Sequence, residues 1–148
     1  MSKIISFRGQ LPIGLQDKLK LSTLNGKTGY KINKFQILSQ SPGGTASEFV
    51  AKIYNKDQTG NETNTVDFTE SDLMAVAFMR GTTATNSDDT VIVIFDNAVT
   101  NQDIFIYIMD AAGATTPCNY YIELETMALS DIEATKLTLQ SIRTITSR

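Results

Sequence analysis

The chain has 148 residues and a net charge of −3 at pH 7, from 13 lysines and arginines against 16 aspartates and glutamates. This length suits one domain with a sizeable core, and a mildly acidic chain without a basic cluster lacks the electrostatic signature of a nucleic-acid-binding protein. With no histidine and one cysteine, histidine-based catalytic groups and intrachain disulfides are excluded. No apolar run approaches the roughly 18 residues of a membrane helix. We therefore expect neither nucleic acid nor a membrane as a partner.

Strand patterns dominate the first half of the chain. Short runs rich in Ile, Val, Phe, Tyr and Thr are separated by Gly, Asn, Asp and Pro. They predict strands at residues 3–8, 17–24, 30–39 and 48–56. Asn25 and Gly26 form a dipeptide typical of hairpin turns, because both residues tolerate positive φ. The polar residues 57–65 indicate a surface loop.

The second half continues with strands. Residues 71–79 are ambiguous; we split them into a turn at 70–73 and a strand that ends at Met79. A second polar loop at 81–89 follows, and then strands are predicted at 90–95, 102–109 and 119–127.

The last two of these strands look like the arms of a hairpin with different exposure. Residues 104–109 are apolar without a break, which predicts a strand covered on one face by the core and on the other by the C-terminal helix or a neighbouring subunit. The other arm alternates strictly. It predicts Tyr120, Ile122 and Leu124 turned inward, with Tyr121, Glu123 and Glu125 turned outward.

The C-terminal segment changes to a helical pattern. Ser130 and Glu133 form a capping box, and good helix formers continue to Arg143. One face of this helix carries Ile132, Leu139 and Ile142, and the other carries Ala134, Leu137 and Ile145. A helix with two apolar faces requires two neighbours, which we expect to be its own sheet and a second chain. The predicted interface residues are Ile132, Leu137, Leu139, Ile142 and Ile145.

These elements predict an all-β fold: a two-sheet antiparallel sandwich of about eight strands, of which a jelly roll is one form, with one C-terminal α-helix. Residues 1–129 would form the sandwich. Residues 130–148 would form a helix packed on the same domain or on a neighbouring subunit. Alternating strand and helix signals are missing, so a doubly wound parallel sheet is not expected.

Three sets of residues are candidates for chemistry, and each has a simpler structural interpretation. Cys118 suits a half-buried apolar position better than a reactive thiol, because nothing nearby would lower its pKa. Glu123 and Glu125 could serve a glycosidase, but a solvated strand face explains them fully. Aspartates at strand ends could bind Ca²⁺, although they are more often turn formers; they are Asp88, Asp89, Asp96, Asp103 and Asp110. We expect no catalytic residue, no metal and no cofactor.

Several stretches together resemble a known family. They are residues 15–23 with 29–32, residues 101–105, and residues 119–125 followed by the helix of 129–143. The chain resembles small virion structural proteins of marine tailed bacteriophages. The resemblance covers most of the chain and implies a particle component, such as a capsid decoration or cement protein, with no catalytic residues.

Two functions of different classes follow. The first is a non-enzymatic virion structural protein, a homo-oligomer that binds the major capsid protein or other virion proteins and is assembled in the cytoplasm of a host bacterium. The absence of disulfides suits such assembly. The alternative is a tail, neck or fibre component, or a module that binds host-surface glycans through loops 57–65 and 81–89.

Overall fold

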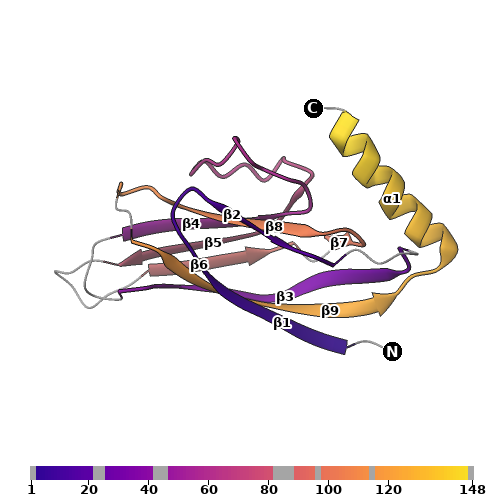
Figure 1. Ribbon diagram of the computed structural model, residues 1–148, viewed down its shortest axis with the longest axis horizontal. Coiled ribbons are helices and arrows are strands. Elements are labelled where there is room, and N and C mark those ends of the chain that lie inside the picture. The colour runs from indigo at the N-terminus through magenta and orange to yellow at the C-terminus, as the bar shows by residue number, and fades with distance from the viewer. Residues whose placement is uncertain are drawn as a thin grey trace.

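Two antiparallel β-sheets face each other in the computed structural model, and a single helix lies across one end of them (Figure 1). The structure describes residues 3–21, 26–41, 47–81, 89–95, 98–113 and 116–146, with helix side chains through Gln140. The strands are β1 (Lys3–Leu11), β2 (Gln16–Leu19), β3 (Thr28–Ser39), β4 (Ser47–Tyr54), β5 (Leu73–Gly81), β6 (Asp89–Ile94), β7 (Val99–Thr100), β8 (Ile104–Asp110) and β9 (Cys118–Ala128). The helix α1 is Asp131–Thr146. The predicted two-sheet sandwich with a C-terminal helix is confirmed.

Sheet A has the strand order β1-β9-β3-β7, and sheet B has the order β2-β8-β4-β5-β6. The long strand β9 is the centre of sheet A and pairs with β1 from Lys3↔Thr126 to Leu11↔Cys118. On its other side it pairs with β3, with a bulge between Ile32 and Lys34. Successive segments of the chain pass repeatedly between the two sheets. The described strands therefore form the two layers of an antiparallel sandwich.

The predictions of a hairpin at Asn25 and Gly26 and of a hairpin formed by the strands 102–109 and 119–127 are wrong. β8 belongs to sheet B and β9 to sheet A, so they are not paired with each other. β2 and β3 also belong to different sheets, although Gly26 does adopt a positive φ of 65°. Turn residues indicate that the chain reverses its direction locally, but they do not indicate which sheet the next strand joins. The different exposure of β8 and β9 arises because each sheet has its own outer environment.

Alternating side chains of the two sheets fill the space between them. Tyr120, Ile122 and Leu124 of β9 are buried, while Tyr121, Glu123 and Glu125 are half-buried on the outer face, as predicted. The facing side chains of sheet B are equally buried; they include Phe49, Ile53, Ala77, Ile104, Ile106 and Ile108. Burying such aliphatic and aromatic side chains contributes about 1.5–3 kcal/mol each, and this is the main driving force for closing the sandwich.

Two strand boundaries and one additional strand differ from the prediction for identifiable reasons. β1 continues through Gly9 to Leu11, because Gly9 pairs with Tyr120 and the phenol ring fills the space that a side chain would occupy. β2 stops at Leu19, and the backbone amide of Leu21 donates instead to the Asp103 carboxylate at 2.7 Å. The two-residue strand β7 is too short for any sequence pattern and brings the described strands to nine rather than eight.

Candidate interaction surfaces

Cys118 and Glu123, which were considered as catalytic residues, lie in surroundings that suit structural roles. Cys118 is fully buried, and burial raises the pKa of its thiol to about 12. Such a thiol is protonated at neutral pH and is a poor nucleophile. Glu123 lies on the outer face of sheet A and accepts a hydrogen bond of 2.7 Å from the Tyr121 hydroxyl. Neither Glu123 nor Glu125 lines the two clefts described below.

Two of the strand-end aspartates stabilise turns. Asp103 accepts from Leu21 and forms an ion pair with Lys18 at 3.3 Å. Asp110 accepts from the amides of Glu48 at 3.1 Å and Ala112 at 2.9 Å. Within the described ranges, no three His, Cys, Asp or Glu side chains gather to hold a metal ion. Asp88, Asp96 and the side chain of Asp89 lie outside the described residues.

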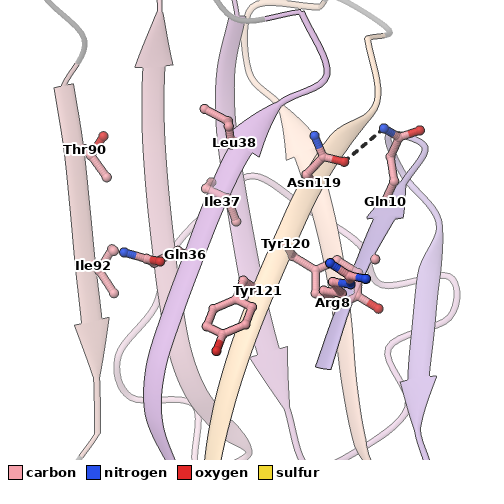
Figure 2. A pocket seen from close by; sticks show the side chains of 11 residues that line it. Arg8, Gln10, Gln36, Ile37, Leu38, Thr90, Ile92, Asn119, Tyr120 and Tyr121 are labelled. Carbon is pink, nitrogen blue, oxygen red and sulfur yellow. Dashed lines mark hydrogen bonds between the residues drawn. The ribbon is translucent and has the colours of Figure 1, made fainter. Parts of the chain in front are cut away.

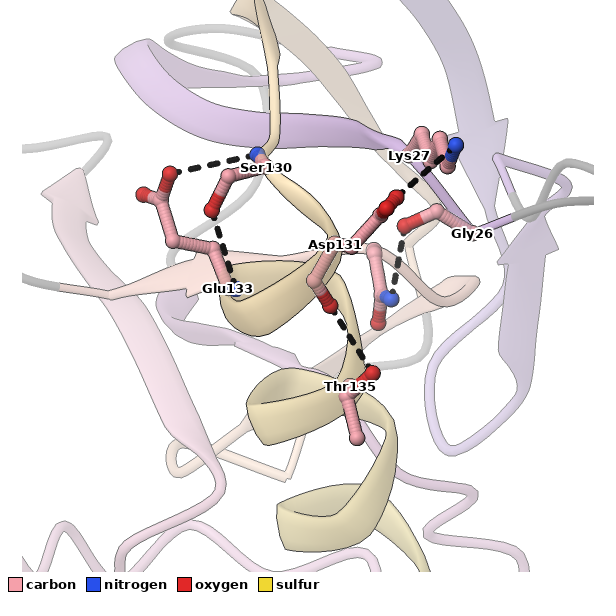
Figure 3. A network of polar contacts seen from close by, with 7 residues as sticks. Gly26, Lys27, Ser130, Asp131, Glu133 and Thr135 are labelled. Atoms are coloured by element: carbon pink, nitrogen blue, oxygen red, sulfur yellow. Dashed lines mark hydrogen bonds and ion pairs between the residues drawn. The ribbon is translucent and has the colours of Figure 1, made fainter.

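A dense polar network fixes the start of α1 to the sandwich (Figure 3). The capping box is present as predicted: the Glu133 amide donates to Ser130 Oγ, and the Ser130 amide donates to the Glu133 carboxylate, both at 3.2 Å. Lys27 forms an ion pair with Asp131 at 2.8 Å. The hydrogen bond to Lys27 and its positive charge lower the pKa of the Asp131 carboxyl. The acidic first turn also complements the helix dipole.

Asn101 is the buried centre of this attachment. Its side chain is 1% exposed, and its Nδ2 donates to the carbonyl oxygens of Gly26 at 3.0 Å and Ala134 at 3.3 Å and to Thr138 Oγ1 at 3.1 Å. One amide group thus joins the β2–β3 connection to two successive turns of the helix. The direction in which α1 leaves the sandwich is set by this contact.

The two apolar faces of α1 have different surroundings. Ala134 is 7% exposed and Leu137 is half-buried beside a cleft of about 410 Å³, whose other wall includes Leu73, Met74 and Ala98 of the sandwich. On the opposite face, the side chains of Ile132 and Leu139 are 82% and 53% exposed. The predicted face toward the chain's own sheets is therefore observed, and the second face has no described neighbour. The side chains of Ile142 and Ile145 lie outside the described residues.

The segment 55–72 covers the outer face of sheet B. Lys52 of β4 is fully buried beneath it and donates to the carbonyl oxygen of Thr65. Tyr107 of β8 stacks on Tyr54 with ring centroids 5.9 Å apart, and its hydroxyl donates to the Thr63 carbonyl at 3.2 Å. The cover over β8 is thus this segment, and the expectation of the C-terminal helix in that place is wrong.

This arrangement also bears on the loops considered for glycan binding. Gln58 of the first loop is 2% exposed, and its backbone N–H donates to Gln16 Oε1 at 2.7 Å, which fastens the loop to β2. Most of the second loop, residues 82–88, lies outside the described residues.

An open corner of the sandwich is the second candidate surface (Figure 2). Among the described strands, β3 has a neighbour opposite β9 only at Tyr30 and Lys31, where β7 pairs with it. The rest of that edge is open because β6 stays in sheet B, where it pairs with β5. A groove of about 930 Å³ results, lined by side chains of β1, β3, β6 and β9. Two apolar side chains of its lining are exposed, Leu38 at 53% and Ile92 at 38%. Val91, next to Ile92 on β6, is 58% exposed.

Sequence reasoning missed the contributions of Asn101, Lys52 and β6. Asn101 and Lys52 are polar residues with no local pattern that marks burial, since their partners are 13 to 75 positions away in the chain. A signal for β6 existed in its run of uncharged, mostly β-branched residues, but that run is equally typical of a central strand.

No helix in the described part of the chain is long and apolar enough to cross a membrane. Comparison with protein-family models gives no match, and comparison with curated proteins gives none either.

Proposed function

We propose that this protein is a non-enzymatic structural component of a bacteriophage particle, a capsid decoration or cement protein that acts as a homo-oligomer and binds the shell through protein–protein contacts. The observation that carries the proposal is the face of α1 that has no neighbour among the described residues. Ile132 and Leu139 are exposed there, on a helix that Asn101 and the capping box hold in one direction. A fixed apolar face of this kind is suited to protein docking, because it requires little ordering when the partner binds.

The remaining features agree with a role in assembly. The single thiol is buried and protonated at neutral pH, and the buried tyrosines fill the core and the cover of sheet B. The resemblance to virion proteins of marine tailed bacteriophages supports the same class. The major capsid protein is the proposed partner of the helix face, and the particle is the proposed location.

Electron microscopy of particles assembled with and without the protein tests this function. We expect symmetry-related density for the sandwich on the particle surface, and we expect the variant Leu139→Lys to be lost from the particle. Val66→Lys is the matched control, because Val66 is 42% exposed on the segment 55–72, outside the helix. Particles with no ordered density for the wild-type protein would reject the proposal.

A tail or fibre role with glycan binding is the second candidate, favoured by one observation. Arg8, Gln36, Asn119 and Tyr121 line the open corner, and guanidinium, amide and aromatic groups are those that contact saccharides. A glycan array followed by the Tyr121→Ala variant tests it. Binding to a saccharide that disappears in the variant, with no density on the capsid, would favour this candidate over the first.

A further inference from the structure

The strand β6 is an unusual edge. Only β5 pairs with it among the described strands, so the backbone N–H and C=O groups on its other side have no partner strand in the described part of the chain. Residues 90–95 read Thr-Val-Ile-Val-Ile-Phe, with no charge, proline or glycine. Uncharged segments with strong β propensity readily add a further strand when they lie at an edge.

The other described edge strands are protected in recognised ways. β1 carries the exposed charged residues Lys3 and Arg8. β2 has four residues, two of which are Asp17 and Lys18. β7 has only two residues. β6 has none of these features between its ends, although it is the strand whose apolar side chains are most exposed.

We propose that β6 pairs with the β6 strand of a second copy of this chain, antiparallel across a two-fold axis. The strand is self-complementary in a way that the other edges are not. Two copies of β1 would bring like charges together, whereas residues 90–95 carry no charge that opposes their own pairing. A two-fold dimer is also the commonest symmetric assembly of a soluble protein.

The register follows from the two faces of the sheet. Ile92 is opposite Ala77, which faces the core, and Val91 is opposite Phe78 on the outer face. Residues directly opposite each other in a sheet share a face, so the paired positions must both be even or both be odd. Centring the axis on Ile92 meets this condition and keeps Asp89 at the end of the ladder. It places Ile92 against its own copy and Val91 against Val93 of the second copy.

This pairing covers apolar side chains that the single chain leaves exposed at the edge of sheet B. Val91 and Ile92, at 58% and 38% exposure, become neighbours of β-branched side chains, which are favourable cross-strand partners. The inward-facing side chains of the second β6 enter the groove of about 930 Å³ beside Ile37 and Leu38. The result is a ten-stranded sheet B that runs through both copies. The pairing does not depend on a role in the phage particle.

Cysteine cross-linking of the full chain tests the register. In the Ile92→Cys variant the two introduced thiols lie opposite each other, close enough for a disulfide. We expect a covalent dimer under mild oxidation, and the native Cys118 does not interfere because it is fully buried. The matched control is Val66→Cys, an exposed position away from β6, which should stay monomeric on a denaturing gel.

Sedimentation velocity tests the edge itself. We expect the wild-type chain to form a dimer at micromolar concentration and Val91→Lys to be a monomer with unchanged circular dichroism, since the lysine lies on an exposed face. Leu139→Lys should leave the dimer intact. A monomeric wild-type chain, or a dimer lost in Leu139→Lys but kept in Val91→Lys, would overturn the inference. A monomeric wild-type chain would also remove the homo-oligomer from the proposed function, but it would leave capsid binding through the helix face untouched.

Discussion

Replacing Asn101 by aspartate is the sharpest test of how the helix is attached. The side chains have nearly the same shape, but the aspartate loses the Nδ2 donor that faces two carbonyl oxygens and Thr138 Oγ1 at 3.0–3.3 Å. The Ala134 carbonyl still accepts from Thr138 Oγ1, but the Gly26 carbonyl loses the Asn101 donor. A lost donor of this kind costs about 1–3 kcal/mol, and an uncompensated buried charge costs about 3–5 kcal/mol. At 1% exposure the site offers little access to water.

We therefore expect Asn101→Asp to lower the free energy of unfolding by about 3–5 kcal/mol at pH 7, as measured by urea denaturation. For a chain of 148 residues this corresponds to a melting temperature lower by roughly 10 °C. Amide hydrogen exchange should show faster exchange in α1 than in β9, because the lost contacts join the helix to the sandwich. The loss should shrink toward acidic pH, since a protonated carboxyl regains one donor.

Asn61→Asp is the matched control. Asn61 is exposed in the segment 55–72, so the same chemical change there should alter the unfolding free energy by less than about 0.5 kcal/mol. Equal stability of Asn101→Asp and Asn61→Asp at pH 7 would refute the assignment of Asn101 as the anchor of the helix.

Two substitutions and one change of pH test the cover of sheet B, the packing around Tyr120 and the buried thiol of Cys118. Lys52→Met should leave stability unchanged or raise it by about 1–4 kcal/mol in urea denaturation, because a buried charge is replaced by a side chain of similar length. Gly9→Ala should cost about 1–3 kcal/mol, since its Cβ would lie 2.7 Å from the Tyr120 hydroxyl oxygen and disturb its 3.0 Å bond to Asp17. Burial raises the pKa of Cys118 from 9.0 to about 12, so stability should be complete below about pH 9 and fall as the pH rises toward 12, by on the order of 4 kcal/mol.

Each of these predictions has a control and a contradicting outcome. Lys20→Met, at an exposed position, controls for the loss of charge, and a loss of more than about 1 kcal/mol in Lys52→Met alone would contradict the first prediction. The cost of Gly9→Ala should fall by at least half in a Tyr120→Leu background; an equal cost there would show that the ring is not the obstacle. The decline at alkaline pH should be shallower in Cys118→Ala, and equal stability of the wild type at pH 8 and pH 11 would contradict the third.

Features of this fold that depend on a few neighbouring residues could be predicted from the sequence, and features that depend on distant residues could not. The alternation of Tyr120, Ile122 and Leu124 and the capping box at Ser130 and Glu133 are encoded within a few residues, and both predictions are confirmed. The pairing of strands is not local. Nothing near β8 reveals that β2 and β4, rather than β9, are its neighbours.

The candidate surfaces show the same limit. The exposed helix face around Ile132 and Leu139 follows from helical periodicity and was predicted as one of two apolar faces. The open corner was not predicted, because it results from β6 staying beside β5 while β7 reaches only Tyr30 and Lys31 of β3. The burial of Lys52 likewise depends on a segment that begins after the strand ends.

The position of β9 has a consequence for the order in which the molecule is made. The ribosome delivers strands from the N-terminus, and β1 and β3 are completed before residue 40, yet their common neighbour in sheet A is residues 118–128. The four-stranded sheet A therefore cannot form on a nascent chain that lacks those residues. Until then β1 has no neighbour in sheet A, and β3 can pair only with the two residues of β7. Such late closure of distant contacts slows folding. Stop codons introduced before β9 should accordingly give products that aggregate or are degraded, rather than a smaller stable sandwich.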